Sequence, residues 1–191
     1  MKNLVLVTML LFVSFSNNSQ IDFRKGEIGA EVFAGFSNFG GSVGGEIKYG
    51  IFYKENLLFG PSFRLHQTWA NNLGQKFSFS MYGPGLFAHY RLQKVLFLGA
   101  EFQYLKSPFN FVTFQQDQVR QWSANLMLGG GFCFELNKRL KLNAGVFYDV
   151  INAPNSPFRS SYNFSVKNEF GQVVRILPII YRVTFFFPFG E

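Results

Sequence analysis

The stretch LNKRLKLNAGVFYDV, residues 136–150, decides the fold class. From Leu140 onward every second residue is apolar, whereas the residues between them include Lys141, Asn143 and Asp149. An alternation with a period of two is typical of a β-strand that has one apolar and one polar face. The rest of the chain has to decide which of the two faces points inward.

Seven other segments show the same period, and none shows a sustained helical period of 3.6 residues. The eight segments are residues 26–36, 43–53, 57–69, 77–91, 95–104, 119–136, 140–150 and 173–187. The mature chain is therefore predicted to be all-β.

The links between these segments alternate in length. Short polar links at residues 54–56, 92–94 and 137–139 alternate with longer ones at residues 37–42, 70–76, 105–118 and 151–172. An up-and-down meander has this pattern when one rim carries tight turns and the other carries loops, as in outer-membrane barrels. The sequence thus predicts an eight-stranded antiparallel up-and-down transmembrane β-barrel, with both termini on the short-turn rim, in the periplasm.

The alternation fails in one segment. Phe79 and Met81 are apolar at odd positions, whereas Leu86 and Tyr90 are apolar at even positions, and the sequence Gly-Pro-Gly at 83–85 lies between them. Proline within a strand is typical of a bulge, so we expect a bulge and a kink at this point.

The two faces of the predicted barrel differ in charge and in the placement of aromatic rings. The apolar face carries no charged residue. Its rings are expected at two levels: Trp69, Tyr104, Trp122 and Tyr148 near the loop rim, and Tyr53, Tyr90, Phe134 and Phe187 near the turn rim. Two aromatic girdles around an aliphatic band are expected at the two lipid–water interfaces, so the apolar face is predicted to face lipid. A lipocalin-like carrier would place that face inside.

The N-terminus indicates export. Residues 1–19 begin with a basic MKN, continue with a ten-residue run that is apolar except for Thr8, and are predicted to be a signal peptide, cleaved after Ser16 or Ser19; residues 20–191 are assigned to the barrel domain. Cys133 is the only cysteine, which excludes an internal disulfide. No later apolar run reaches the roughly 18–20 residues of a membrane helix.

The formal net charge is +7, but the basic residues form no block. A nucleic-acid partner is therefore not expected. The charge favours contact with an anionic surface, so outer-membrane lipid and lipopolysaccharide are the expected partners.

With these features the chain resembles the small eight-stranded outer-membrane barrels, the OmpA/OmpX-like group, and especially the outer-membrane β-barrel domains common in Gram-negative bacteria of the Bacteroidetes type. The resemblance is carried by the signal peptide, by FGPSF at 59–63, by YGPGLFAHYRLQKVLFLGAEFQY at 82–104 and by the aromatic YRVTFFFPF at 181–189. It implies roles in membrane structure, adhesion, evasion of host defences or larger outer-membrane complexes. Gly190 and Glu191 follow the last aromatic residue, whereas family members usually end on one.

Six charged residues of the polar face are expected at similar heights above the turn rim. They are three acids and three bases: Glu31, Glu46, Lys48, Arg64, Glu101 and Arg182. The interior of an eight-stranded barrel is just wide enough for side chains to fill, and unpaired buried charge is very costly. We expect a paired network that plugs the barrel; the alternative is an ion or proton pathway, hence a small channel.

An enzyme is not predicted, and neither a cofactor nor a metal is expected. Some barrels of the resembled group modify lipid A with a His/Ser/acid set, and His66 and His89 are the histidines available here. Their expected heights differ, and the sequence places no serine and acid together beside either, so both histidines are expected to belong to a polar network in the lumen. A lipid A-modifying barrel enzyme therefore remains the alternative function.

The two longest loops are rich in aromatic residues that suit contact with a partner protein or with the outer leaflet. The candidate contact residues are Phe109, Phe111, Phe114, Phe158, Arg159, Tyr162 and Phe164. The alternative is that these side chains pack on one another as a cap. The sequence thus predicts a structural or interaction protein, with an accessory subunit of a larger outer-membrane complex as one form of that role.

Overall fold

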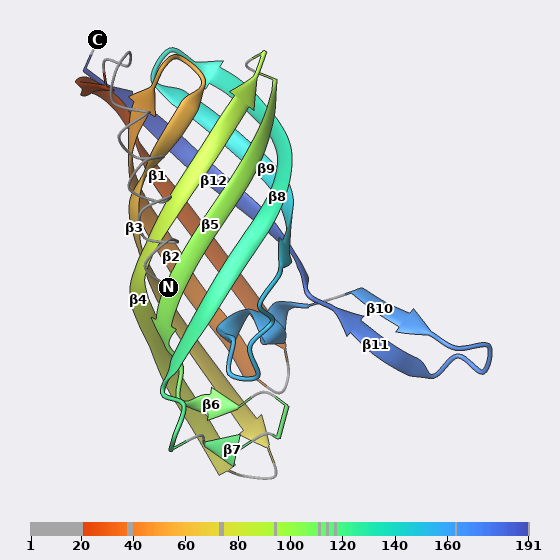
Figure 1. Ribbon diagram of the computed structural model, residues 1–191. Coiled ribbons are helices and arrows are strands. Elements are labelled where there is room, and N and C mark those ends of the chain that lie inside the picture. Colours follow the sequence, from red (N-terminus) through yellow and green to blue (C-terminus); the bar gives the residue numbers. More distant parts are fainter. Residues whose placement is uncertain are drawn as a thin grey trace, which may run out of the picture.

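The computed structural model describes residues 21–37, 40–72, 75–93, 95–110, 112–113, 115–116, 118–162 and 164–190. In this part of the chain the long strands form a closed antiparallel barrel (Figure 1), which confirms the predicted eight-stranded all-β fold. The barrel strands are β1 (Ile21–Ser37), β2 (Gly40–Tyr53), β3 (Leu57–Asn72), β4 (Gln75–Leu92), β5 (Leu96–Lys106), β8 (Trp122–Asn137), β9 (Leu140–Asp149) and β12 (Ile179–Phe189). The predicted signal peptide lies outside the described residues.

Shorter elements lie between the barrel strands on the loop side. The hairpin of β6 (Phe109–Asn110) and β7 (Gln115–Gln116) follows β5, and η1 (Pro157–Ser161) follows β9. The hairpin of β10 (Phe164–Lys167) and β11 (Val173–Leu177) precedes β12. Among the described residues, no helix is long and apolar enough to cross a membrane.

The stagger of the strands fixes the tilt and width of the barrel. A path that follows paired residues once around the barrel leaves β12 at Ile179 and returns to it at Phe189, ten residues later. The path passes through Tyr148, Leu128, Ala100, Ala88, Phe59, Ile51 and Gly26. With a rise of about 3.3 Å per residue and strands about 4.8 Å apart, this stagger tilts the strands by about 40°. Eight strands at this tilt enclose a lumen that side chains can fill.

The two faces of the wall alternate as predicted. On β5, burial alternates along the whole strand, with Leu96, Leu98 and Phe102 exposed and Phe97 and Glu101 buried. The large apolar residues of the predicted apolar face are exposed on the outside of the barrel. Examples from the other strands are Ile28, Val32, Ile47, Phe63, Leu65, Leu86, Tyr90, Leu128, Phe132, Phe134, Val146, Tyr148, Tyr181, Val183, Phe185 and Phe187.

The bulge expected at residues 83–85 is absent. The pairing of β3 with β4 runs without a shift from Leu57–Tyr90 to Asn72–Gln75. Met81 is buried and Tyr82 is exposed on the outside, in phase with Leu86. The prediction was wrong because it assumed that every apolar side chain of β4 points outward, whereas the loop end of the lumen is itself lined with apolar side chains.

The last predicted strand, residues 173–187, is two strands. β11 pairs with β10 outside the barrel, and β12 pairs with β9 and β1 in the wall. Pro178 separates them, because proline has no N–H with which to continue a ladder. The Pro178 carbonyl accepts a hydrogen bond from the Asp149 N–H at 2.8 Å, where β12 enters the barrel.

Two of the links expected to be long are short. β1 ends at Ser37 and β2 begins at Gly40, while β3 ends at Asn72 and β4 begins at Gln75. Glycine and asparagine suggested loops at these places, but the strands continue through most of them. Long links remain only between β5 and β8 and between β9 and β12, so the difference between the rims is carried by these two connections.

Rings and aliphatic side chains fill the lumen above and below its charged middle. One buried cluster contains Phe97, Leu105, Met127, Phe147, Phe158 and Ile180, and another contains Leu58, Phe87 and Phe186. Phe147 fits because glycines occupy the inward positions beside it on the neighbouring strands: Gly129 pairs with Phe147, and Gly99 pairs with Gly129. A Cβ atom on Gly99 would lie 2.9 Å from the Phe147 ring, and one on Gly129 would lie 2.8 Å from it.

Gly99→Val is expected to lower the free energy of unfolding by about 1–3 kcal/mol, because the new side chain overlaps the Phe147 ring. Urea denaturation of the purified protein measures this change. Ala100→Val, on the outer face of the same strand, is the matched control. Equal effects of the two substitutions would contradict the packing described for the lumen.

Candidate functional site

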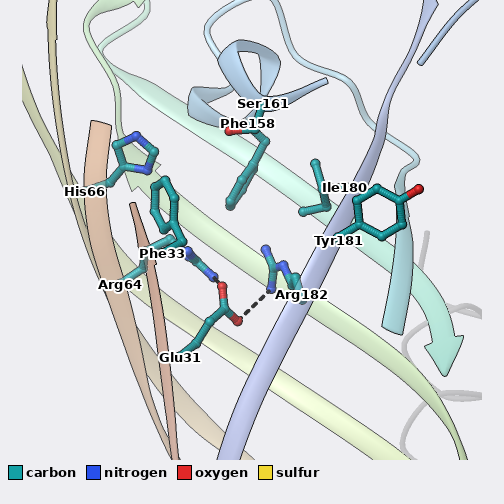
Figure 2. A pocket seen from close by; sticks show the side chains of 9 residues that line it. All are labelled: Glu31, Phe33, Arg64, His66, Phe158, Ser161, Ile180, Tyr181 and Arg182. Atoms are coloured by element: carbon teal, nitrogen blue, oxygen red, sulfur yellow. Dashed lines mark hydrogen bonds and ion pairs between the residues drawn. The ribbon is translucent and has the colours of Figure 1, made fainter. Parts of the chain in front are cut away.

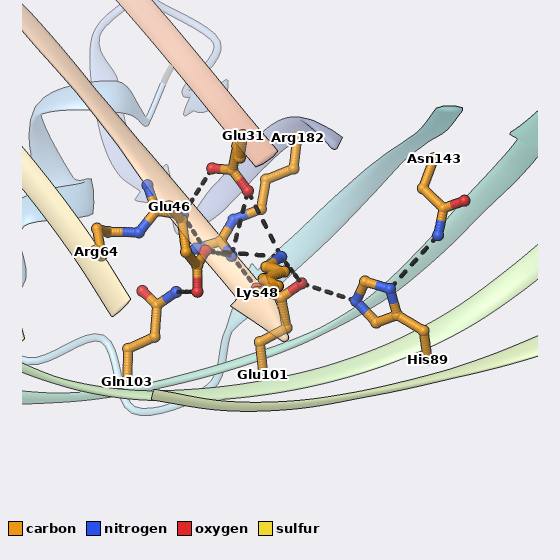
Figure 3. A network of polar contacts seen from close by, with 9 residues as sticks. All are labelled: Glu31, Glu46, Lys48, Arg64, His89, Glu101, Gln103, Asn143 and Arg182. Carbon is orange, nitrogen blue, oxygen red and sulfur yellow. Dashed lines mark hydrogen bonds and ion pairs between the residues drawn. The ribbon is translucent and has the colours of Figure 1, made fainter. Parts of the chain in front are cut away.

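The six predicted interior charges come together in the middle of the lumen (Figure 3), where each is at most 5% exposed. We call them the lumen charge network: Glu31, Glu46, Lys48, Arg64, Glu101 and Arg182. They come from β1, β2, β3, β5 and β12, so they meet only when the barrel closes. Their formal charges sum to zero.

Two groups of short contacts make up the lumen charge network. Arg64 Nη2 lies 2.6 Å from Glu31 Oε1 and 2.6 Å from Glu46 Oε2. Glu101 accepts hydrogen bonds from Lys48 Nζ at 2.6 Å and from Arg182 Nη1. Longer contacts of 3.6 Å join Lys48 to Glu31 and Glu46, and Arg182 to Glu46. Each carboxylate therefore lies within 4 Å of more than one cation.

Three further side chains extend the lumen charge network. His89 Nε2 lies 2.8 Å from Glu101 Oε1, and its Nδ1 lies 3.4 Å from Asn143 Nδ2. Gln103 donates a hydrogen bond to Glu46 Oε1 at 2.7 Å. The sequence predicted His89 as a member of the lumen network but assigned neither Gln103 nor Asn143 to it. Their register opposite the acids, which depends on the stagger, is what brings them into contact.

A second buried ion cluster lies nearer the turn rim and was not predicted. Arg91 donates two hydrogen bonds to Glu27, at 2.8 and 2.5 Å, and Lys141 Nζ lies 2.9 Å from the same carboxylate. The Arg91 guanidinium also lies 5.4 Å from the centre of the Phe186 ring. The charges at this end are thus paired as well, and the lumen is occupied at both levels.

The two histidines make separate polar contacts. His66 Nε2 lies 2.9 Å from Thr68 Oγ1, and His89 lies between Glu101 and Asn143. In the described part of the chain neither histidine is hydrogen-bonded to a serine. No group of three or more His, Cys, Asp or Glu residues among the described residues is arranged to hold a metal ion.

The chain after β9 folds back over the mouth of the barrel as a cap, which we define as residues 150–162. Asp149 accepts hydrogen bonds from the Tyr162 hydroxyl at 2.8 Å, from Ser156 Oγ at 3.2 Å and from the Asn152 N–H at 3.0 Å. Burial and the Asp149 carboxylate raise the pKa of the Tyr162 hydroxyl, which therefore remains protonated as a donor. Asn155 fastens the cap from the other side.

Asn155 binds to the segment that follows β5 and leads into β8. Its side-chain Nδ2 donates to the main-chain carbonyls of Ser107, Arg120 and Trp122 at 2.9–3.1 Å. The main-chain carbonyl of Asn155 accepts a hydrogen bond from Ser107 Oγ at 2.5 Å. Asn155 and Ser107 are both buried. The cap is therefore held by both long connections of the loop rim.

Phe158 is the part of the cap that reaches the lumen charge network. Its ring centre lies 5.1 Å from the guanidinium carbons of both Arg64 and Arg182 (Figure 2), and the residue is only 4% exposed. A cavity of about 150 Å³ lies beside it, bordered by Glu31, Phe33 and His66 among others. The sequence offered Phe158 as a contact residue for a partner, but the structure buries it.

The other candidate contact residues have different surroundings. Arg159 donates to the carbonyls of Asn152 and Ala153, so it stabilises the cap. The Phe109 ring packs on the Phe79 ring in a tilted arrangement, with ring centres 4.7 Å apart. Phe164 stands at the base of the β10–β11 hairpin, and Tyr162 belongs to the cap. Phe111 and Phe114 lie outside the described residues.

Glu101→Gln is expected to destabilise the barrel by about 3–5 kcal/mol, because Lys48 and Arg182 would lose the carboxylate that neutralises them both. The unfolding free energy from urea titration measures the loss. Glu55→Gln, in the exposed turn between β2 and β3, removes the same charge without a buried partner and should leave the stability nearly unchanged. A small effect of Glu101→Gln would mean that the interior is more hydrated than its packing indicates.

No protein-family model matches this chain, and no curated protein or solved structure matches it either.

Proposed function

We propose that this chain is an integral β-barrel of a bacterial outer membrane, with a plugged interior and a structural or protein-interaction role, including that of an accessory subunit in a larger complex. The observation that carries the proposal is the distribution of polarity: paired charges fill the inside, and uncharged apolar side chains cover the outside of the wall. A barrel in water would gain stability from the opposite arrangement. A barrel in lipid requires this one.

The dimensions of the apolar face support a lipid environment. On β5 this face runs from Leu96 to Tyr104, nine residues, within the range of about 9–11 that a tilted strand needs to cross a bilayer. Outward polar residues begin just beyond it: Lys106 on β5, and Gln67 on β3, which hydrogen-bonds Ser78 and Ser80 of β4. The apolar face therefore has a limit on the loop side.

Aromatic side chains mark that limit. The ten-residue stagger is shared among eight tilted strands, so residues that pair across strands lie at different heights along the barrel axis. The residue at the height of Ile179 on β5 therefore lies about four residues beyond Ala100, at Tyr104. On β4 it lies about five residues beyond Ala88, next to Tyr82. The Tyr104 ring stacks on Trp122, with centres 5.1 Å apart. A lower row includes Phe187 on β12, about 20 Å below Ile179 at this tilt. Two such girdles are expected where a barrel meets the two interfaces.

The plugged lumen disfavours the channel alternative, since the charges that would line a pathway are paired with one another. The lipid A-modifying alternative receives no support from the geometry. His66 contacts Thr68, and His89 contacts Glu101 and Asn143. A role carried by the outer wall and the loop rim is what remains.

Membrane fractionation and gel mobility test the proposal directly. The protein is expected in the outer-membrane fraction, released only by detergent, and expected to migrate faster on a gel without boiling than after boiling, because a closed barrel resists the detergent. Recovery of a folded protein in the detergent-free soluble fraction would overturn the proposal.

Leu98→Arg separates a lipid-facing wall from a water-facing one. Leu98 is 58% exposed in the apolar face, so in water the substitution would change stability by less than about 0.5 kcal/mol. In lipid, a cation between the midplane and the interface is expected to cost about 1–3 kcal/mol. Unfolding from vesicles in guanidinium measures the difference, and Leu98→Ala controls for the lost side chain. A neutral Leu98→Arg in vesicles would argue against a lipid-facing wall.

A further inference from the structure

The β10–β11 hairpin leaves the barrel wall and projects sideways from it (Figure 1). Its two strands pair with each other, and within the described part of the chain they join no other sheet. An isolated two-stranded hairpin is marginally stable in water. Contacts beyond this pairing therefore bear on its stability.

The hairpin emerges at the level of the loop-side aromatic girdle. β11 ends at Leu177, and β12 begins at Ile179, which lies level with Tyr104 and Tyr82 by the stagger of the strands. Phe164, at the base of β10, packs on the outward ring of Tyr181 with centres 5.6 Å apart. This contact fixes the start of the hairpin against the outer wall of the barrel, at the level where we place the lipid–water interface.

The composition of the hairpin suits that interface on both of its faces. Pairing of Phe164 with Leu177 and of Ser165 with Ile176 puts apolar residues on opposite faces. The exposed apolar residues are Phe164, Val166, Phe170, Val173, Val174 and Ile176, and Phe170 at the tip is 86% exposed. Lys167 and Arg175 add two cations, against one acid, Glu169. Long basic side chains on an apolar element can reach phosphates while their stems stay in the apolar layer.

We propose that the β10–β11 hairpin lies along the membrane surface and binds anionic lipid headgroups of the outer leaflet. The inference rests on the proposed membrane location of the barrel and goes beyond it by assigning a lipid-binding surface. Apolar side chains enter the boundary between headgroups and acyl chains, Lys167 and Arg175 bind phosphates, and headgroups and water satisfy the open strand edges. The hairpin thereby widens the footprint of the barrel in one direction.

The test uses single-cysteine variants in the full-length protein, with Cys133→Ser as the background. Cysteine replaces Val174 in the hairpin, Leu98 in the apolar face or Glu55 in a tight turn, and each variant carries an environment-sensitive fluorophore. The proteins are reconstituted into phosphatidylcholine vesicles that contain phosphatidylglycerol. Iodide reports exposure to water, and phospholipids brominated along the acyl chain report contact with lipid.

The label at residue 174 should be quenched by brominated lipid and should be severalfold less sensitive to iodide than the label at residue 55. If the label at 98 contacts lipid while the label at 174 behaves as the one at 55 does, the hairpin inference is overturned and the barrel location stands. If neither 98 nor 174 contacts lipid, the proposed function itself fails. Because these vesicles contain no other protein, lipid contact at 174 cannot come from a partner protein.

Removal of the two cations tests the headgroup specificity. Lys167→Gln with Arg175→Gln should raise the iodide sensitivity at residue 174 severalfold in vesicles containing phosphatidylglycerol, and should have less effect in phosphatidylcholine alone. Lys138→Gln with Arg139→Gln removes the same charge at the exposed turn between β8 and β9 and should change nothing at 174. Equal responses in the two kinds of vesicle would contradict binding to anionic headgroups.

Discussion

The rest of this structure depends on the closure of eight strands with a stagger of ten residues. That stagger sets the tilt, and the tilt with the strand number sets a lumen that side chains fill. Whatever points inward must therefore pack or pair. Phe147 fits only because Gly99 and Gly129 lie beside it, and Glu101 is tolerated only because Lys48 and Arg182 reach it from β2 and β12. Each interior residue is constrained by strands that are distant in sequence.

The ion pairs inside the lumen cost desolvation free energy, so their presence needs a reason other than stability. Ions buried at this depth lose their hydration, and an uncharged core of the same volume would serve stability as well or better. What the charges do provide is register: Arg64 meets both Glu31 and Glu46 only in one alignment of β1, β2 and β3. A strand slipped by one residue would place these charges on the apolar outer face. The lumen charge network therefore selects one closed arrangement.

The structure departs from the sequence-based predictions where one residue type can occupy either of two environments, outside or inside the barrel. Met81 and Phe79 are apolar, and the alternation rule alone assigned them to the outer face, which forced a bulge at residues 83–85. They instead belong to the apolar loop end of the lumen, and with the phase restored Tyr82 joins the outer girdle. Phe158 was offered as a partner-contact residue because its segment has the composition of a loop, with packing in a cap as the alternative. Its burial follows from hydrogen bonds of Asn155 and Tyr162 that span 13 to 48 residues, which local composition does not reveal.

By itself, the sequence determined the strand class, the strand number and the separation of charged from apolar faces, because these follow from a two-residue period and from the spacing of polar turns. It also identified the six charges of the lumen charge network, since inward phase and approximate height can be counted along each strand. Only the tertiary structure decided which acid meets which base, that Gln103 and Asn143 join them, and that the cap closes the mouth with Phe158. It also decided that residues 164–177 leave the wall as a hairpin. These features depend on the stagger and on contacts between distant segments, which become defined only when β12 closes on β1.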